Sequence, residues 1–334
     1  MKIAVLAPVA WRTPPRHYGP WEQMASNLTE GLVASGLEVS LFATGDSVTN
    51  ANLNAVIQTG YEEDRTLDAK VVECLHISNL MEQANEFDLI HNHYDFLPLS
   101  YSKLIKTPVI TTIHGFSSEK ILRVYQKYNQ NSHYVSISNA NRHSSLNYLA
   151  TVYNGLQTDE FEFNDKPDEY LLFFGRIHPD KGTAEAIQIA INANKRLVIA
   201  GIIQDANYFD EKVKPFLNGN IEFIGSAGPE KRNQLLRNAA ALLHPISFDE
   251  PFGLSVAEAM LCGTPVIAFN RGSMPELIKD GETGFLVGTV EQAVTAVSSL
   301  STIKREDCRN WALEKFSMEK MVEDYISLYH KILD

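Results

Sequence analysis

The chain of 334 residues has only three cysteines, Cys74, Cys262 and Cys308, and they lie far apart. An odd number of cysteines with no Cys-x-x-Cys pair predicts neither a disulfide framework nor a zinc cluster. No run of 18 apolar residues occurs, so we expect no integral membrane association. The short apolar start, MKIAVLAPVA, is expected to be a buried first strand rather than a signal peptide. These features together predict a cytoplasmic protein.

Positive charge is also scarce. The chain has 29 Lys and Arg against 41 Asp and Glu, a formal net charge of −12. Such a surface repels a polyanion on average, so we expect no nucleic-acid partner. No basic amphipathic stretch is present, which argues against binding to an anionic membrane. A local basic site for one phosphate group remains compatible with this balance.

Several nucleotide-binding and catalytic motifs are missing. The sequence contains no Gly-x-Gly, no Gly-Lys dipeptide, no Gly-x-Ser-x-Gly elbow and no Asp-x-Asp pair. The usual nicotinamide fingerprint, the Walker A loop and the serine-hydrolase elbow are therefore excluded, as is the acidic pair that holds a divalent ion on a diphosphate. If this chain binds a diphosphate, side-chain cations and backbone N–H groups must neutralise it.

What the sequence does contain is an alternation of short apolar runs with longer amphipathic ones. This pattern predicts an α/β fold with two Rossmann-like, doubly wound parallel sheets facing a cleft. Expected helices in the first half are Trp21–Ala34, Ala69–Ala84, Glu119–Tyr128 and Asn139–Asn147, and in the second half Ala184–Asn194, Pro229–Asn238, Leu254–Leu261, Met274–Lys279 and Glu291–Leu300. Ligands of doubly wound sheets bind at the carboxyl ends of the strands, so the chemistry is expected in the loops that follow strands.

The alternation breaks once, in the polar stretch 158–169, and then restarts with a new strand. We therefore predict an N-terminal domain over 1–157 and a C-terminal domain over 158–317. A last helix over 318–334 carries an apolar stripe that must rest on one of the two domains, and the N-terminal domain is its candidate partner.

Two loops carry the candidate site. FFGRIHPDKG follows a strand and places Arg176 and Lys181 together. Two such cations are either solvated or clamp a phosphate, and their position at a strand end favours the clamp. The second loop is HPISFDEPFGLSVAEAM, in which Glu250 precedes a helix that starts at Gly253 and contains Glu258. A helix N-terminus suits an anion, whereas the two glutamates suit sugar hydroxyls; for Glu258 the alternative is a solubilising helix position.

The run from Glu250 through EAMLCGTPV resembles the signature of the retaining glycosyltransferases of family 4, which have a GT-B fold. The resemblance extends to FFGRIHPDKG, to VYNG at 152–155, to GFLV at 284–287 and to YGPWE at 18–22, and so covers nearly the whole chain. The chain is similar in particular to compact bacterial members that glycosylate small molecules. The chain departs from the family at Pro20, where a second glycine is usual, and at Pro251, where many relatives have glycine.

The resemblance implies that the domain over 1–157 is the acceptor side and that the domain over 158–317 binds the nucleotide sugar. It also implies which residues form the donor site. Arg176 and Lys181 would hold the diphosphate, Glu258 the ribose hydroxyls and Glu250 the hexose hydroxyls. Backbone N–H groups would complete the site at Phe252, Gly253 and Leu254, while His114 would approach the hexose and Gly19 the phosphates. The predicted catalytic residues are thus His114, Arg176, Lys181 and Glu250. The base of the nucleotide is expected to bind near 225–228.

Acceptor-side residues are predicted less directly, from the aromatic-rich loop 11–21 and a strand end. The candidates are Tyr18, Trp21, Glu22 and His93, whose planar or polar groups suit a sugar or a flat ring. Histidines 91, 93 and 114 leave a metal site open as an alternative. Spread over separate strand ends, they favour hydrogen-bonding roles, and we predict no metal ligand and no cofactor.

The function expected from this resemblance is retaining, metal-independent transfer of a hexose. The predicted donor is UDP-glucose, with GDP-mannose second, and the acceptor is a hydroxyl of a small soluble molecule or saccharide. Two alternatives remain: a nucleotide-sugar 2-epimerase or hydrolase of the same fold, and a silent nucleotide-sugar-binding regulator. The sequence predicts neither the acceptor, the linkage nor the oligomeric state.

Overall fold

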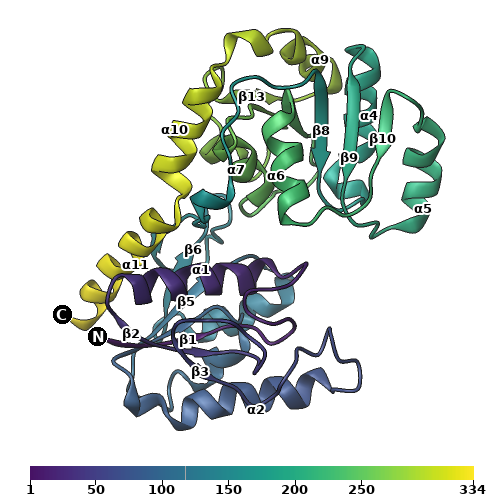
Figure 1. Cartoon of the computed structure of the whole chain (residues 1–334). Coiled ribbons are helices and arrows are strands. Elements are labelled where there is room, and N and C mark those ends of the chain that lie inside the picture. The colour runs from purple at the N-terminus through teal and green to yellow at the C-terminus, as the bar shows by residue number, and fades with distance from the viewer. Residues whose placement is uncertain (117) are drawn as a thin grey trace. The chain divides into compact units, whose positions relative to one another are not determined.

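The computed structural model describes residues 1–116 and 118–334. The chain divides into unit 1, Met1–Gly155 with Met318–Asp334, and unit 2, Leu156–Ser317. Each unit has one parallel sheet covered by helices, as Figure 1 shows. The predicted α/β fold with two Rossmann-like domains is confirmed. Within the residues described, no helix has both the length and the apolar character needed to cross a membrane.

Unit 1 contains a seven-stranded sheet in the order β3-β2-β1-β4-β5-β6-β7. Its strands are β1 (Lys2–Leu6), β2 (Glu38–Phe42), β3 (Asn52–Asn54), β4 (Leu89–Asn92), β5 (Val109–Ile113), β6 (His133–Ser136) and β7 (Tyr148–Thr151). All neighbours pair in parallel. The order reverses between β1 and β4, and ligands of such sheets bind at the carboxyl ends of the strands on either side of this reversal.

The helices of unit 1 come from both ends of the chain. They are α1 (Pro20–Ala34), α2 (Ala69–Glu82), α3 (Leu122–Tyr128) and α11 (Met318–Leu333), with the 3-10 helices η1 (Ala84–Glu86), η2 (Leu97–Tyr101) and η3 (Glu119–Ile121). Helix α11 lies beside α1 (Figure 1). Gly31 permits this approach, because a Cβ there would lie 2.3 Å from Val322 Cγ2. Tyr325 and Tyr329 of α11 are buried in the core of unit 1.

The predicted helix over Asn139–Asn147 is wrong, since the segment forms turns that lead into β7. Its polar side chains bond the backbone and each other instead of supporting a helix. Asn141 Nδ2 donates to the Ile113 carbonyl (2.9 Å), and Ser138 Oγ accepts from the Asn141 N–H (3.0 Å). Short polar side chains compete with helical hydrogen bonds in this way.

Unit 2 contains a six-stranded sheet in the order β10-β9-β8-β11-β12-β13. Its strands are β8 (Tyr170–Phe174), β9 (Arg196–Ala200), β10 (Ile221–Phe223), β11 (Ala241–His244), β12 (Val266–Phe269) and β13 (Gly284–Val287). All pair in parallel, and the order reverses between β8 and β11. The loops that follow these two strands are therefore where the fold favours a ligand.

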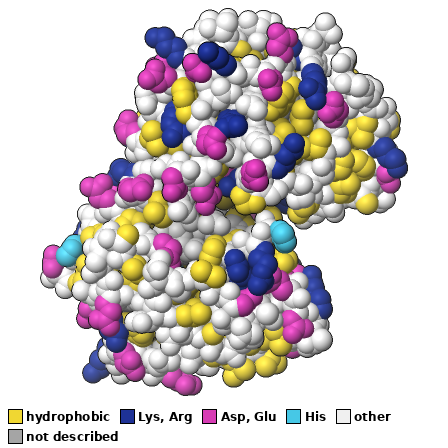
Figure 2. All heavy atoms as spheres, in the orientation of Figure 1, with side chains coloured by type: hydrophobic (Ala, Val, Ile, Leu, Met, Phe, Trp, Pro, Cys, Tyr) yellow, Lys and Arg dark blue, Asp and Glu magenta, His cyan; other side chains and the backbone are white. Residues whose placement is uncertain are grey.

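The helices of unit 2 fall between its strands, with two more after β13. They are α4 (Thr183–Asn192), α5 (Ala206–Tyr208), α6 (Pro229–Asn238), α7 (Leu254–Leu261), α8 (Met274–Leu277), α9 (Val290–Ser298) and α10 (Arg305–Phe316). Short helices are η4 (Thr158–Glu160), η5 (Pro179–Lys181), η7 (Lys214–Phe216) and η8 (Leu300–Thr302), and Phe209–Val213 forms a turn of π-helix. On the face that Figure 2 shows, hydrophobic side chains gather over the part of unit 2 that holds β9, β10 and α5.

Candidate functional site

The loop after β8 is held against the loop after β9. The Ile177 N–H donates to the Ile202 carbonyl (2.8 Å), which extends strand pairing past the end of the sheet. Gly201 (φ 154°) permits the contact, because a Cβ there would lie 1.7 Å from the Gly175 carbonyl oxygen. Arg176, next in this loop, donates from Nη1 to Gln204 Oε1. Its side chain is thus fixed at the carboxyl edge of the sheet.

Lys181 follows in the same loop and is directed toward the end of β11. It ends η5, after which Gly182 takes a left-handed conformation (φ 74°). Only glycine fits at position 182, since a Cβ would lie 1.9 Å from the Pro245 carbonyl oxygen. The Ser247 N–H also donates to the Asp180 carbonyl (2.8 Å), so the loops after β8 and β11 are bonded together.

Lys181 Nζ is in direct contact with Glu250 Oε2, and both side chains are 14% exposed. The ammonium group also lies 4.6 Å from the ring centroid of Phe248. His244 Nε2, at the end of β11, is 3.8 Å from Glu250 Oε2. Burial, with a smaller contribution from Lys181, lowers the pKa of His244 to about 3, so this imidazole is neutral at pH 7. The centre of the site is therefore one cation paired with one carboxylate.

The backbone around Glu250 is clamped by the loop after β12. Gly272 (φ 53°) lies so close that a Cβ would be 2.3 Å from the Glu250 nitrogen. The Ser273 N–H donates to the Glu250 carbonyl (3.0 Å), and Ser273 Oγ donates to the Phe252 carbonyl (2.6 Å). Gly253 (φ 95°) is the N-cap of α7, whose first N–H groups face outward from its N-terminal end. The structure thus brings the predicted backbone donors at 252–254 next to Glu250.

Glu258, in the second turn of α7, is a buried carboxylate. Its Oε1 accepts a hydrogen bond from Arg232 Nη1 of α6 (3.1 Å), and its side chain is 9% exposed. Burial raises the pKa of Glu258, and the positive charge of Arg232 opposes that shift. Among the residues that the structure describes, the Arg232 bond is the only one to this carboxylate. One carboxylate oxygen is therefore left without a protein donor.

In unit 1, His114 lies between two other predicted residues. Its Nε2 shares a hydrogen bond with Nδ1 of His93 (3.0 Å). The Trp21 ring stacks on its imidazole, with centroids 5.6 Å apart and planes 22° apart. Burial lowers the pKa of His114 to about 3, and it also lowers that of His93. Both imidazoles are therefore neutral and suited to hydrogen bonding.

His91 is bound into the protein on both ring nitrogens. Its Nδ1 shares a hydrogen bond with Tyr329 Oη of α11 (2.7 Å) and its Nε2 with Thr112 Oγ1 (2.7 Å). Over 1–116 and 118–334, no group of three or more His, Cys, Asp or Glu side chains is arranged to hold a metal ion. The three histidines thus lie close together, with His91 serving as a link between β4 and α11.

Glu22 and Gly19 meet at the start of α1. A Cβ on Gly19 (φ 152°) would lie 2.9 Å from Glu22 Oε2, so the glycine covers the carboxylate. Burial raises the pKa of Glu22 to about 7, although backbone N–H groups of Glu22 and Trp11 oppose the shift. Pro20 is the first residue of α1, where its missing N–H has no cost. Tyr18, by contrast, is 47% exposed.

Sequence reasoning missed several residues of these loops. Arg232 and Gln204 were not selected because a single polar residue in a helix or loop shows no pairing until the fold is known. Asp95, after β4, has a positive φ of 120° and accepts a hydrogen bond from Tyr125 Oη (2.6 Å). Burial raises the pKa of Asp95 to about 6. No local signal in HNHYDF predicts the strained backbone of Asp95 or the burial of its carboxyl.

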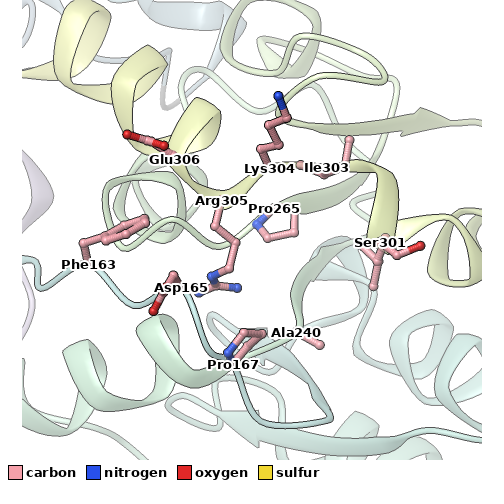
Figure 3. A pocket seen from close by; sticks show the side chains of 11 residues that line it. Phe163, Asp165, Pro167, Ala240, Pro265, Ser301, Ile303, Lys304, Arg305 and Glu306 are labelled. Atoms are coloured by element: carbon pink, nitrogen blue, oxygen red, sulfur yellow. The ribbon is translucent and has the colours of Figure 1, made fainter.

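A pocket of about 590 Å³ lies elsewhere in unit 2, around Arg305 (Figure 3). Its lining includes Pro167, Ala240 and Pro265, which precede β8, β11 and β12, so it opens at the amino-terminal edge of the sheet. The Arg305 guanidinium donates to the carbonyls of Ala239 (2.9 Å) and Arg237 (2.7 Å). This arginine therefore joins loops, and the pocket is at the opposite edge from the predicted donor residues.

Comparison with known proteins identifies the family. The family described as "Glycosyl transferases group 1" matches residues 157–315, and "Glycosyltransferase Family 4" matches residues 22–159. The chain belongs to glycosyltransferase family 4. An uncharacterized 41.2 kDa protein in the cps region of Klebsiella pneumoniae is 30% identical over 73% of this chain and 79% of its own length.

Solved structures of other proteins share the fold of this family 4 member. Sucrose-phosphate synthase from Thermosynechococcus elongatus has a TM-score of 0.80 at 19% identity, over 99% of each chain. HepE of Anabaena, in complex with UDP, has a TM-score of 0.76 at 17% identity, over 99% of this chain and all of its own. The predicted GT-B fold is therefore confirmed.

Proposed function

We propose that this family 4 glycosyltransferase is a retaining, metal-independent hexosyltransferase. Its donor is UDP-glucose, with GDP-mannose second, and its acceptor is a hydroxyl of a small soluble molecule or saccharide. The observation that carries the proposal is the contact between Lys181 and Glu250, which joins a cation and a carboxylate from the loops after β8 and β11. A diphosphate and a sugar need these two groups side by side.

The diphosphate is assigned to Arg176, Lys181 and the N-terminus of α7. Breaking the anomeric C–O bond builds negative charge on the diphosphate, and preorganised cations and N–H groups stabilise it. When the donor binds, before this bond breaks, Lys181 exchanges Glu250 for a phosphate oxygen. The released carboxylate then accepts hydrogen bonds from the hexose. The departing phosphate oxygen takes the acceptor's proton, so no separate base is required for retention.

The nucleoside is assigned to Glu258 and to the apolar surface beside it. Glu258 has one carboxylate oxygen available for ribose hydroxyls. Ile202 and Ile203 after β9 and Ile224 after β10 are 44%, 43% and 38% exposed, next to the glycines at 225 and 228. An exposed apolar surface at a strand end suits the flat face of a base. HepE in complex with UDP supports a uridine nucleotide at a site of this fold.

In unit 1, His114 is assigned to the hexose and Gly19 to the phosphates, and Tyr18, Trp21, Glu22 and His93 are assigned to the acceptor. The stacked Trp21 and His114 rings offer a flat surface to a sugar. The name of sucrose-phosphate synthase, whose product is a small saccharide, is consistent with a small acceptor here.

Two measurements test this proposal together. A thermal-shift screen of UDP- and GDP-sugars identifies the donor, and mass spectrometry of acceptor mixtures with that donor identifies the product. The one-bond carbon–proton NMR coupling at the new anomeric carbon then reports the configuration of that carbon. We expect one nucleotide sugar to raise the melting temperature and the product to keep the donor's anomeric configuration. Inverted configuration, or donor hydrolysis without transfer, contradicts the proposal.

A further inference from the structure

Arg232 has no role in the assignments above, yet it is fixed on three sides. It lies in the first turn of α6, after β10. Its Nη1 donates to Glu258 Oε1 (3.1 Å), and its Nη2 lies 3.3 Å from Glu160 Oε2. Its guanidinium carbon is 5.1 Å from the ring centroid of Phe161. The head group is therefore held in one orientation.

The two carboxylates that Arg232 contacts differ in burial. The Glu258 side chain is 9% exposed, and that of Glu160 is 46% exposed. Solvent screens the pair with Glu160, so that contact contributes little. The pair with Glu258 is poorly screened, and loss of either partner would leave a buried charge. The main electrostatic role of Arg232 is therefore to hold Glu258.

The geometry of this pair leaves half of the carboxylate available. Arginine often binds a carboxylate through two parallel hydrogen bonds. Here one guanidinium nitrogen bonds one oxygen, and within the described residues Glu258 Oε2 has no donor. Oε2 is not one of the buried side-chain atoms that lack a partner, so it is accessible and can accept a hydrogen bond from a ligand that brings hydroxyl groups.

We propose that Arg232 is a positioning residue of the donor site, which holds Glu258 by Oε1 and so directs Oε2 to a ribose hydroxyl of the nucleotide. The inference rests on the proposed function, because it assumes that Glu258 meets the ribose. It adds a residue outside both signature loops that determines how well the site distinguishes ribose from deoxyribose.

The charge of Arg232 also controls the protonation of Glu258. The charged or titratable groups around this carboxylate are Arg232 on α6, Glu160 on η4 and Cys262, the residue that follows α7. On α10, Arg305 and Arg309 act on Cys262. Burial and Glu160 raise the pKa of Glu258, and Arg232 lowers it. Without Arg232 the carboxyl therefore protonates at a higher pH and becomes a weaker acceptor.

Calorimetric titration of the full chain with UDP, 2′-deoxy-UDP and 3′-deoxy-UDP tests the proposal, with GDP and its deoxy forms in parallel. The variants are Arg232→Met, Arg232→Lys and Glu258→Gln, with Lys231→Met at the neighbouring exposed position as the matched control. We expect the wild type and Lys231→Met to prefer a ribonucleotide about tenfold over one deoxy form. Arg232→Met should reduce this preference to less than threefold, because it weakens the binding of the ribonucleotide and not that of the deoxy form. Arg232→Lys should restore most of the preference.

A purely structural role for Arg232 would not make the preference depend on pH. In Arg232→Met we expect the preference to recover as the pH is raised, because the pKa of Glu258 is higher without Arg232 and a higher pH ionises the carboxyl again. If Arg232→Met does not fold, Arg232→Gln keeps an amide donor without the charge, and the same loss and recovery are expected. Melting curves monitor folding of every variant.

The outcomes separate this inference from the proposed function. If Glu258→Gln loses the ribose preference but Arg232→Met or Arg232→Gln keeps it, the role of Arg232 is overturned. The proposed donor site is then unaffected. An unchanged preference in Glu258→Gln overturns both ribose assignments. If the wild type binds no nucleoside diphosphate, the proposed function fails and the inference fails with it.

Discussion

Lys181 and Glu250 are 69 positions apart in the sequence, and the Nζ of one is in contact with the Oε2 of the other. Each neutralises the other in the ligand-free protein, and both side chains are largely buried. A donor nucleotide sugar must therefore separate them and replace both halves of the pair. The pair keeps the two groups preorganised until phosphate and hexose hydroxyls arrive.

Lys181→Ala is expected to lower kcat/KM for the nucleotide sugar by about 10²–10³, since one preorganised donor to the leaving group is lost. Lys214→Ala is the matched control, because Lys214 pairs with Asp210 on the surface, where both side chains are more than 60% exposed. Steady-state kinetics with both variants provide the comparison. Near-normal turnover in a folded Lys181→Ala protein would contradict the assignment.

Glu22→Gln is expected to stabilise unit 1 at high pH. The folded-state pKa of Glu22 is raised to about 7, above its ordinary value of 4.5, because the side chain is buried. The stability that protonated Glu22 contributes is thus complete below pH 4.5 and is lost as pH rises through 7. The glutamine resembles the protonated form, so the variant's advantage should grow to at most about 3 kcal/mol by pH 8. Urea unfolding at pH 4.5 and 8 measures it, and equal differences at both would refute the shift.

Gly31→Ala is expected to loosen the contact between α1 and α11. The new methyl group would lie 2.3 Å from Val322 Cγ2, and overpacking of this kind costs about 1–3 kcal/mol. In a Val322→Ala background the clash is absent, and alanine should then be neutral or stabilise the helix by about 1 kcal/mol. A double-mutant cycle by chemical denaturation measures the difference. Additive effects of the two substitutions would rule out this contact.

Tyr329→Phe is expected to destabilise unit 1 by about 1–3 kcal/mol. The substitution removes the hydroxyl that shares a hydrogen bond with His91 Nδ1, and both residues are fully buried. Tyr18→Phe is the control, since Tyr18 is 47% exposed. If both variants have the same unfolding free energy as the wild type, the bond between α11 and β4 contributes nothing.

The sequence predicted those parts of the fold that local signals define. The bounds of α6 and α7 were correct because Pro229 and Gly253 mark where each begins. The segment 139–147 misled the prediction because its polar side chains bond the backbone. Helix α10 was missed, since its buried positions, Cys308, Ala312 and Phe316, are few among charged residues.

The candidate site was predictable only as far as single loops. FFGRIHPDKG and the run from Glu250 to Glu258 were each recognisable, but their junction depends on Gly182 lying against Pro245 and Gly272 against Glu250. Pairings such as that of Arg232 with Glu258 arise from tertiary structure, because the two residues are 26 positions apart on different helices. No spacing in the sequence encodes such a pair.

In the proposed donor site, the chain's own cations and amides neutralise the diphosphate at the ends of β8 and β11. The decisive measurement is calorimetric titration of UDP in the presence of EDTA. We expect binding of equal affinity with and without added magnesium, and at least tenfold weaker binding in Lys181→Ala than in Lys214→Ala. Binding that requires a divalent ion, or that is unaffected by the loss of Lys181, would contradict it.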